Sequence, residues 1–150
     1  MHKGCRLKQL HIEQLHETFL NADEGSTRMF KIRPGEDEYL DLFEEVPIPK
    51  KAIIHIRDGS MGFNARFIVV VIMECLEKGL GLAMAQNHES LTISPRDRAS
   101  EKRLVRIAKY YGVPFVFYMI YSKNRTLQRI YMEQDQYRLC EAIISMNMEV

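Results

Sequence analysis

The sequence has few cysteines, and none of them lie close together. Cys5, Cys75 and Cys140 form no C-x-x-C pair, and the five histidines are scattered along the chain. These side chains predict no metal site, because a structural metal site needs clustered ligands. An odd number of cysteines without a signal peptide is typical of a reducing compartment, so we expect a cytoplasmic protein.

Long apolar runs are also missing. The segment 1–17 alternates charged and apolar residues and lacks the apolar core of a signal peptide. The most apolar run, FIVVVIM at 67–73, is too short to span a bilayer, so we expect no membrane contact. The formal net charge of +1 argues against wholesale binding to nucleic acid and leaves such binding to a local patch.

Linkers, repeats and catalytic signatures are absent as well. No low-complexity tract divides the 150 residues, so we expect one domain over residues 1–150, long enough to bury roughly two-thirds of its unfolded surface. The sequence contains no nucleophile–base pair, G-x-S-x-G motif or P-loop. Any chemistry must therefore come from an arrangement of residues.

The pattern of apolar residues predicts an α/β fold with a single mixed sheet flanked by helices. The clearest helix covers 94–112, opened by Ser94 and closed by Gly112. The apolar run 113–121 is typical of a central strand that is covered on both faces. We expect the helix to bury one stripe of residues, Leu104, Ile107, Ala108 and Tyr111.

The remaining elements complete the order βα(α)βββαβαβ. Residues 63–78 have two interpretations, a helix ending at Gly79 or a strand over 66–73, and the β-branched content favours the strand. An Asp-Gly pair predicts a hairpin turn at 57–60. This turn would join a strand at 50–56 to the strand at 66–73. We expect further strands at 6–10, 50–56, 82–86, 90–94 and 137–147, and helices at 11–23, 35–45 and 121–139.

An arginine-rich turn lies where the strand at 90–94 is expected to enter the basic helix. The N–H groups and dipole at the start of a helix favour an anion, and four cations add formal charge, Arg96, Arg98, Lys102 and Arg103. A phosphate-bearing ligand is one interpretation. A solvated basic helix face is the other.

Two short motifs resemble the GNAT acyltransferase superfamily. The segment LTISPRDR at 91–98 is similar to the family's L-x-V-x-P-x-x-R, with Leu91, Ile93, Pro95 and Arg98 at the matching positions. The spacing of Asn124 and Tyr131 is similar to N-x-x-A-x-x-L-Y, with Leu127 and Ile130 in between.

This resemblance implies transfer of an acyl group from acetyl-CoA or another acyl-CoA to an amine acceptor. Tyr131 would protonate the leaving thiolate, Glu89 or His88 would act as the base, and strand N–H groups would hold the oxyanion. The cofactor-binding residues implied by the resemblance are Ile93, Arg96, Arg98, Ala99, Ser100, Lys102 and Asn124.

Two other functions stay open. Residues 99–102 contain no glycine where the family has a glycine-rich loop, and side chains there obstruct close backbone approach to phosphate. A protein-interaction domain that kept the fold without the chemistry fits this departure. The C-terminal half, with GFNARF at 62–67, also resembles the kink-turn RNA-binding ribosomal proteins, which implies phosphate contacts from Arg96, Arg98, Lys102, Arg103, Arg106, Lys109, Lys123, Arg125 and Arg129.

Overall fold

A computed structural model of the chain describes residues 7–23, 26–34, 40–57 and 60–145. Its centre is a six-stranded sheet of order β2-β1-β5-β6-β7-β8. β5 and β6 run parallel and the other neighbours antiparallel, so the expectation of a mixed sheet is confirmed. The strands are β1 (Thr27–Pro34), β2 (Leu40–Val46), β5 (Gly81–Asn87), β6 (Phe115–Ser122), β7 (Arg125–Met132) and β8 (Leu139–Ser145).

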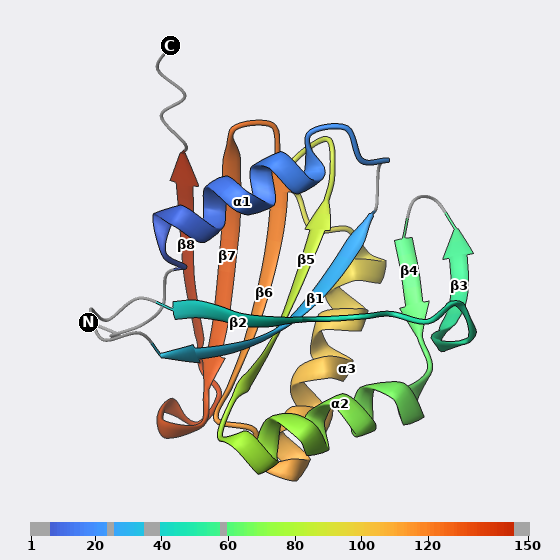
Figure 1. Cartoon of the computed structure of the whole chain (residues 1–150), viewed down its shortest axis with the longest axis vertical. Helices are drawn as coiled ribbons and strands as arrows, with labels where there is room; N and C mark the ends of the chain where they lie inside the picture. Colours follow the sequence, from blue (N-terminus) through green and yellow to red (C-terminus); the bar gives the residue numbers. More distant parts are fainter. Residues whose placement is uncertain (1–6, 24–25, 35–39, 58–59, 146–150) are drawn as a thin grey trace.

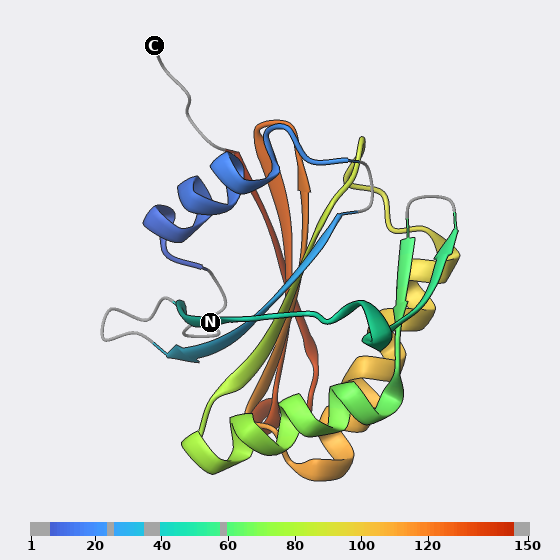
Figure 2. The same ribbon diagram turned by 45° about the vertical axis from the view of Figure 1, so that its right-hand side comes forward.

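Helices cover both faces of this sheet (Figure 1). α1 (Gln9–Phe19) crosses one face, whereas α2 (Ala65–Lys78) and α3 (Pro95–Tyr111) lie on the other, and Figure 2 shows the two layers apart. Each side has its own hydrophobic cluster. A separate hairpin of β3 (Ile53–Arg57) and β4 (Ser60–Phe63) packs beside α3. The prediction of an α/β fold flanked by helices is therefore correct.

The structure confirms α3 and its two end signals. The Ser94 hydroxyl accepts a hydrogen bond from the Asp97 N–H at 3.1 Å, and Gly112 ends the helix with φ of 78°, a conformation that side chains disfavour. Leu104 and Ala108 are buried as expected. Tyr111 is 37 % exposed, so its place in the buried stripe was predicted wrongly. The central strand is also confirmed, because every residue of β6 is buried.

The strand predicted over 66–73 is wrong, and the helical alternative is correct. Asn64 caps α2 by accepting the Arg66 N–H at 2.8 Å, and Gly79 ends it with φ of 67°. The buried residues of α2 recur at intervals of three and four, while Val70 and Met73 between them are exposed. The β-branched residues therefore cover the sheet as a helix. The predicted strand at 50–56 is confirmed in part as β3, but its partner is β4.

Two N-terminal predictions are also wrong. The expected strand at 6–10 reduces to a single bridge between Leu7 and Leu40, since α1 begins at Gln9. The helix expected over 35–45 lies partly outside the described residues, and its described part is β2. The acids of β2 meet cations of β1 across the pair. Arg28 contacts Glu45 at 2.6 Å and Lys31 contacts Glu44 at 3.1 Å, contacts that favour a paired strand.

The helix predicted over 121–139 is the main error in the C-terminal half. A two-residue turn leads from β6 into β7, and β7 pairs with β6 from Phe115↔Met132 to Ser122↔Arg125. The spacing of apolar residues led to a wrong prediction because both faces of β7 are buried. The buried residues include Thr126, Gln128 and Arg129. Polar residues on a doubly covered strand erase the alternation that marks a strand. Residues 90–94, predicted as a strand, form a loop, whereas β8 confirms the last strand.

Candidate functional site

The cations of α3 lie on its solvent side, which we call the basic face. At 100° per residue they cover an arc of about 160°, and each one is exposed. The two acids of α3 lie outside this arc and are buried, with Asp97 4 % and Glu101 2 % exposed. The solvent side of the helix therefore carries charge of one sign. The basic face consists of Arg96, Arg98, Lys102, Arg103, Arg106 and Lys109.

Asp97 and Glu101 are four residues apart and thus share one side of the helix. Asp97 Oδ2 lies 3.3 Å from Nε2 of His88, and this contact lowers the pKa of Asp97 against the effect of burial. The Glu101 carboxylate accepts two hydrogen bonds from Arg129, at 2.6 and 2.9 Å. Because both acids have interior partners, they do not neutralise the basic face.

Arg129 belongs to the interior rather than to a surface. Its guanidinium contacts Glu101 and also Glu141 of β8. The hydrogen bonds to Glu101 raise the pKa of Arg129 above its usual value. The side chain is only 8 % exposed, so its prediction as a phosphate contact was wrong.

Tyr131 joins the same buried group. Its hydroxyl donates to Glu101 Oε1 at 2.8 Å, and burial, together with that carboxylate, raises the pKa of Tyr131 to about 12. Nearby, the Tyr118 hydroxyl donates to Gln86 Oε1 at 2.5 Å. The sequence analysis missed this polar layer under α3. The four-residue step from Asp97 to Glu101, continued by Leu104 and Ala108, was the signal that these acids face inward.

A pocket of about 480 Å³ lies at the carboxyl ends of β5 and β6, and we call it the strand-end pocket. The ends of parallel strands are a common place for ligands. The pocket brings together three residues that the sequence analysis selected, His88, Glu89 and Asn124. Its other lining residues are His16, Phe19, Leu20, Ala22, Asn87, Tyr121 and Lys123.

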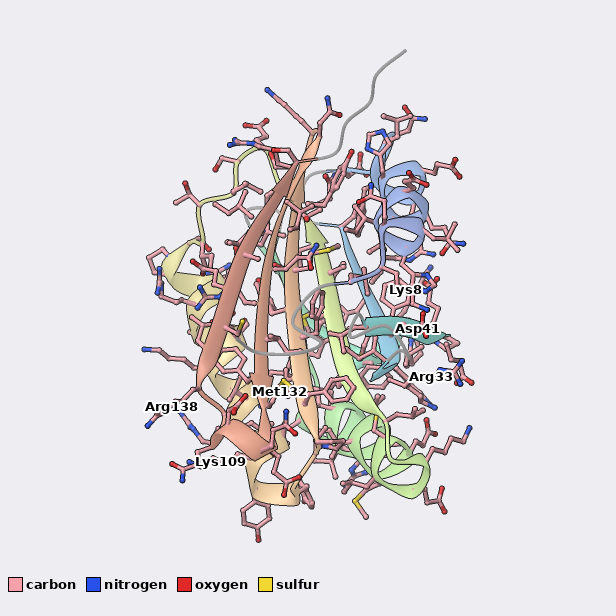
Figure 3. The ribbon with its side chains drawn as sticks, turned by 90° about the vertical axis from the view of Figure 1, so that its left-hand side faces the viewer. Lys8, Arg33, Asp41, Lys109, Met132 and Arg138 are labelled. Atoms are coloured by element: carbon pink, nitrogen blue, oxygen red, sulfur yellow. The ribbon has the colours of Figure 1, made fainter. Side chains whose placement is uncertain are left out.

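Tyr131 is not part of this pocket. Seven residues of extended strand separate it from Asn124, or about 23 Å. It also packs with the α3-side cluster, whereas Phe19 and Tyr121 of the pocket belong to the α1-side cluster. Met132, its neighbour, lies in the lower half of Figure 3, far from the turn that joins β6 to β7. Glu89 and Tyr131 therefore cannot act on one substrate, and the acid role of Tyr131 stays a prediction.

The residues implied to bind acyl-CoA lie at the start of α3. Arg96, Arg98, Ala99 and Lys102 are exposed, and Ser100 and Ile93 are half-buried. Asn124 instead lines the strand-end pocket. The pairing of β5 with β6 continues unbroken from Leu82↔Val116 to Asn87↔Tyr121, and the His88 N–H donates to the Tyr121 carbonyl at 2.9 Å. The strand N–H groups are thus engaged, and these residues do not fit acyl-CoA in the way that the resemblance implies.

No protein-family profile matches the chain, and no curated protein matches it in sequence. None of the described helices is long and apolar enough to cross a membrane. The two sites are therefore interpreted from their geometry alone.

Proposed function

We propose that the chain binds RNA through the basic face of α3. The observation that carries this proposal is the sorting of charge on one helix, since both acids are buried and all six cations are exposed. Phosphate contacts from lysine and arginine supply most sequence-independent affinity for nucleic acid. The net charge of the chain is only +1, so this charge is a local patch.

Five of the six cations of the basic face are available for phosphate. Arg98, Lys102, Arg103, Arg106 and Lys109 make no ion pair or side-chain hydrogen bond within the described part of the chain. Several of them repel one another, because Arg98 and Arg106 each lie four residues from Lys102. Each such like-charge pair destabilises a helix by about 0.2 to 0.5 kcal/mol. Bound phosphate relieves this repulsion.

An exposed aromatic side chain accompanies the cations. Tyr110 projects from the arc of the basic face and is 82 % exposed, and its ring meets Tyr111 edge-on at a centroid distance of 5.0 Å. Unstacked RNA bases bind to such rings, which favours loops and single strands over duplex. Arg138 is exposed at the same end of the molecule as Lys109 (Figure 3).

The test is fluorescence anisotropy with a labelled stem-loop RNA over a range of salt concentrations. Five phosphate contacts predict a fall in affinity of about five-hundredfold between about 50 and 200 mM salt. The variant Arg98→Glu, Lys102→Glu, Arg106→Glu should abolish binding at the higher salt. The matched control, Lys50→Glu, Lys51→Glu, Lys78→Glu, reverses three exposed cations elsewhere and should bind as the native chain does.

Equal effects of the two triple variants would contradict the proposal. A blunt duplex DNA of the same length serves as competitor. Competition by the duplex as strong as by the RNA would show a general polyanion site and exclude the role proposed for Tyr110.

Acyl transfer from acyl-CoA to an amine is the second candidate. What supports it is the order β5–α3–β6, a parallel strand pair joined by a capped helix, which the resemblance also implies. Coenzyme A should then raise the melting temperature by binding the folded state, and Arg98→Glu should remove that rise. The unbroken pairing of β5 and β6 favours RNA binding over this candidate.

A further inference from the structure

The floor of the strand-end pocket contains a buried histidine with one nitrogen left for a ligand. His16 is 8 % and Tyr121 3 % exposed, and Nδ1 of His16 is hydrogen-bonded to the Tyr121 hydroxyl. Nε2 of His16 has no hydrogen-bond partner among the described residues. Within that part of the chain, every fully buried side-chain nitrogen or oxygen has a partner. Nε2 is therefore accessible to solvent. Because His16 lines the strand-end pocket, Nε2 is accessible from that pocket.

The Tyr121 hydroxyl and Nδ1 of His16 share one proton in their hydrogen bond. Burial raises the pKa of Tyr121, which keeps a proton on the phenol, and we assign the phenol as the donor and Nδ1 as the acceptor. A neutral imidazole that accepts at Nδ1 carries its proton on Nε2. With the phenol as donor, the pocket presents an N–H donor from His16, and its ligand needs an acceptor.

The other polar groups of the pocket fall into two kinds. Some hold the frame together, since Asn87 Nδ2 donates to the Ala22 carbonyl at 3.1 Å and Nε2 of His88 faces Asp97. Others lie exposed at the rim, where Lys123 supplies a cation and Glu89 an anion. A ligand with a single negative charge satisfies Lys123, whereas Glu89 opposes higher charge.

The apolar part of the floor is aromatic. Phe19 is 2 % exposed, and its ring stacks on Tyr121 with a centroid distance of 5.7 Å. Flat apolar groups prefer such offset arrangements. We propose that the strand-end pocket binds a small aromatic carboxylate, with the carboxylate on Nε2 of His16 and the Lys123 ammonium and the ring against Phe19 and Tyr121. This inference does not depend on the proposed RNA binding.

The experiment uses the full chain with ¹⁵N-labelled histidine and two probes of similar shape, benzoate and benzyl alcohol. Ring ¹⁵N shifts should first show His16 as the Nε2–H tautomer, and Tyr121→Phe should mix the tautomers. Benzoate should then shift the His16 ring signals and bind about tenfold more tightly than benzyl alcohol, as expected for a charge-assisted hydrogen bond. Equal affinity for the two probes, or no shift at about 10 mM benzoate, would overturn the proposal.

Two substitutions at one position separate the donor from the shape of the pocket. His16→Phe keeps a ring without the donor and should weaken benzoate by about tenfold. His16→Gln places an amide N–H near the position of Nε2 and should bind within about threefold of the native chain. The rim is tested by Lys123→Gln, which should lower the affinity for benzoate. The control is Lys78→Gln, which should leave this affinity unchanged. Native affinity in folded His16→Phe would refute the role of Nε2, and if that variant does not fold, loss of benzoate binding in His16→Gln would refute it.

Discussion

Tyr121 and Tyr131 lie on neighbouring strands, and the hydroxyl of each is hydrogen-bonded to a titratable side chain of a helix. Tyr121 of β6 faces α1 and meets His16, whereas Tyr131 of β7 faces α3 and meets Glu101. Tyr121 is buried and Tyr131 is half-buried, and in both cases burial raises the pKa of the phenol. The two contacts look alike as pairs of residues.

Their surroundings differ. The Tyr131 hydroxyl enters a filled group in which Arg129 takes up the rest of the Glu101 carboxylate. The Tyr121 hydroxyl takes up only one nitrogen of His16 and leaves the other to a pocket. The seven-residue spacing from Asn124 selected Tyr131. The difference teaches that a motif selects a residue type, while the neighbouring space decides whether that residue can meet a ligand.

The largest effect is expected from Glu101→Gln, which breaks the filled group on the α3 side. Among the residues that the structure describes, Arg129 would keep Glu141 as its one acidic partner, and leaving a buried charge poorly paired costs about 3 kcal/mol in the free energy of unfolding. Urea unfolding measures this loss. Glu89→Gln at the rim of the pocket is the control, expected within about 0.5 kcal/mol of the native chain. A loss no larger than the control's would show that Glu141 alone neutralises Arg129.

A smaller effect is expected from Tyr131→Phe, about 1 kcal/mol near neutral pH for one hydrogen bond. The folded pKa of about 12 is above the usual value of 10, so the stabilisation is complete below pH 10 and lost as the pH rises to 12. The difference in unfolding free energy between the native chain and Tyr131→Phe should therefore shrink over that interval. A constant difference would mean that the hydroxyl is not held by Glu101.

The smallest effect on stability is expected from Tyr110→Ala, because this tyrosine is 82 % exposed and its ring contacts Tyr111, another exposed side chain. The free energy of unfolding should stay within about 0.5 kcal/mol, while affinity for the stem-loop RNA should fall about tenfold through lost base stacking. Leu20→Ala removes another exposed apolar side chain, 62 % exposed, and should change neither. A loss of RNA affinity in Leu20→Ala equal to that in Tyr110→Ala would contradict the proposed stacking.

The parts of the fold that the sequence predicted are those with more than one local signal. α3 has a capping serine, a first-turn proline and a terminal glycine, and β6 is a continuous run of apolar and aromatic residues up to its last residue, Ser122. β7 offered a single ambiguous signal, because Leu127, Ile130 and Tyr131 fit a helical spacing. Gln128 and Arg129 of β7 have partners far away in the chain, Leu7 and Glu101, and no local pattern reveals such partners.

The two sites differ in the same way. The basic face could be predicted from the sequence, because its six cations lie in one continuous segment, the helix α3. The strand-end pocket was not visible, because residues 16–22, 87–89 and 121–124 meet only in the folded chain. Glu89 and Asn124 were selected for another reason and prove to be neighbours there.

The buried polar residues of β7 have a consequence for the order of folding. Gln128 Oε1 accepts the Leu7 N–H at 3.0 Å across 121 residues of sequence, and Arg129 requires Glu101. Contacts between such distant residues make folding slow, because long loops must close before they form. During synthesis Leu7 must wait for β7 to leave the ribosome, so this contact forms only after the residues between Leu7 and Gln128 have been made.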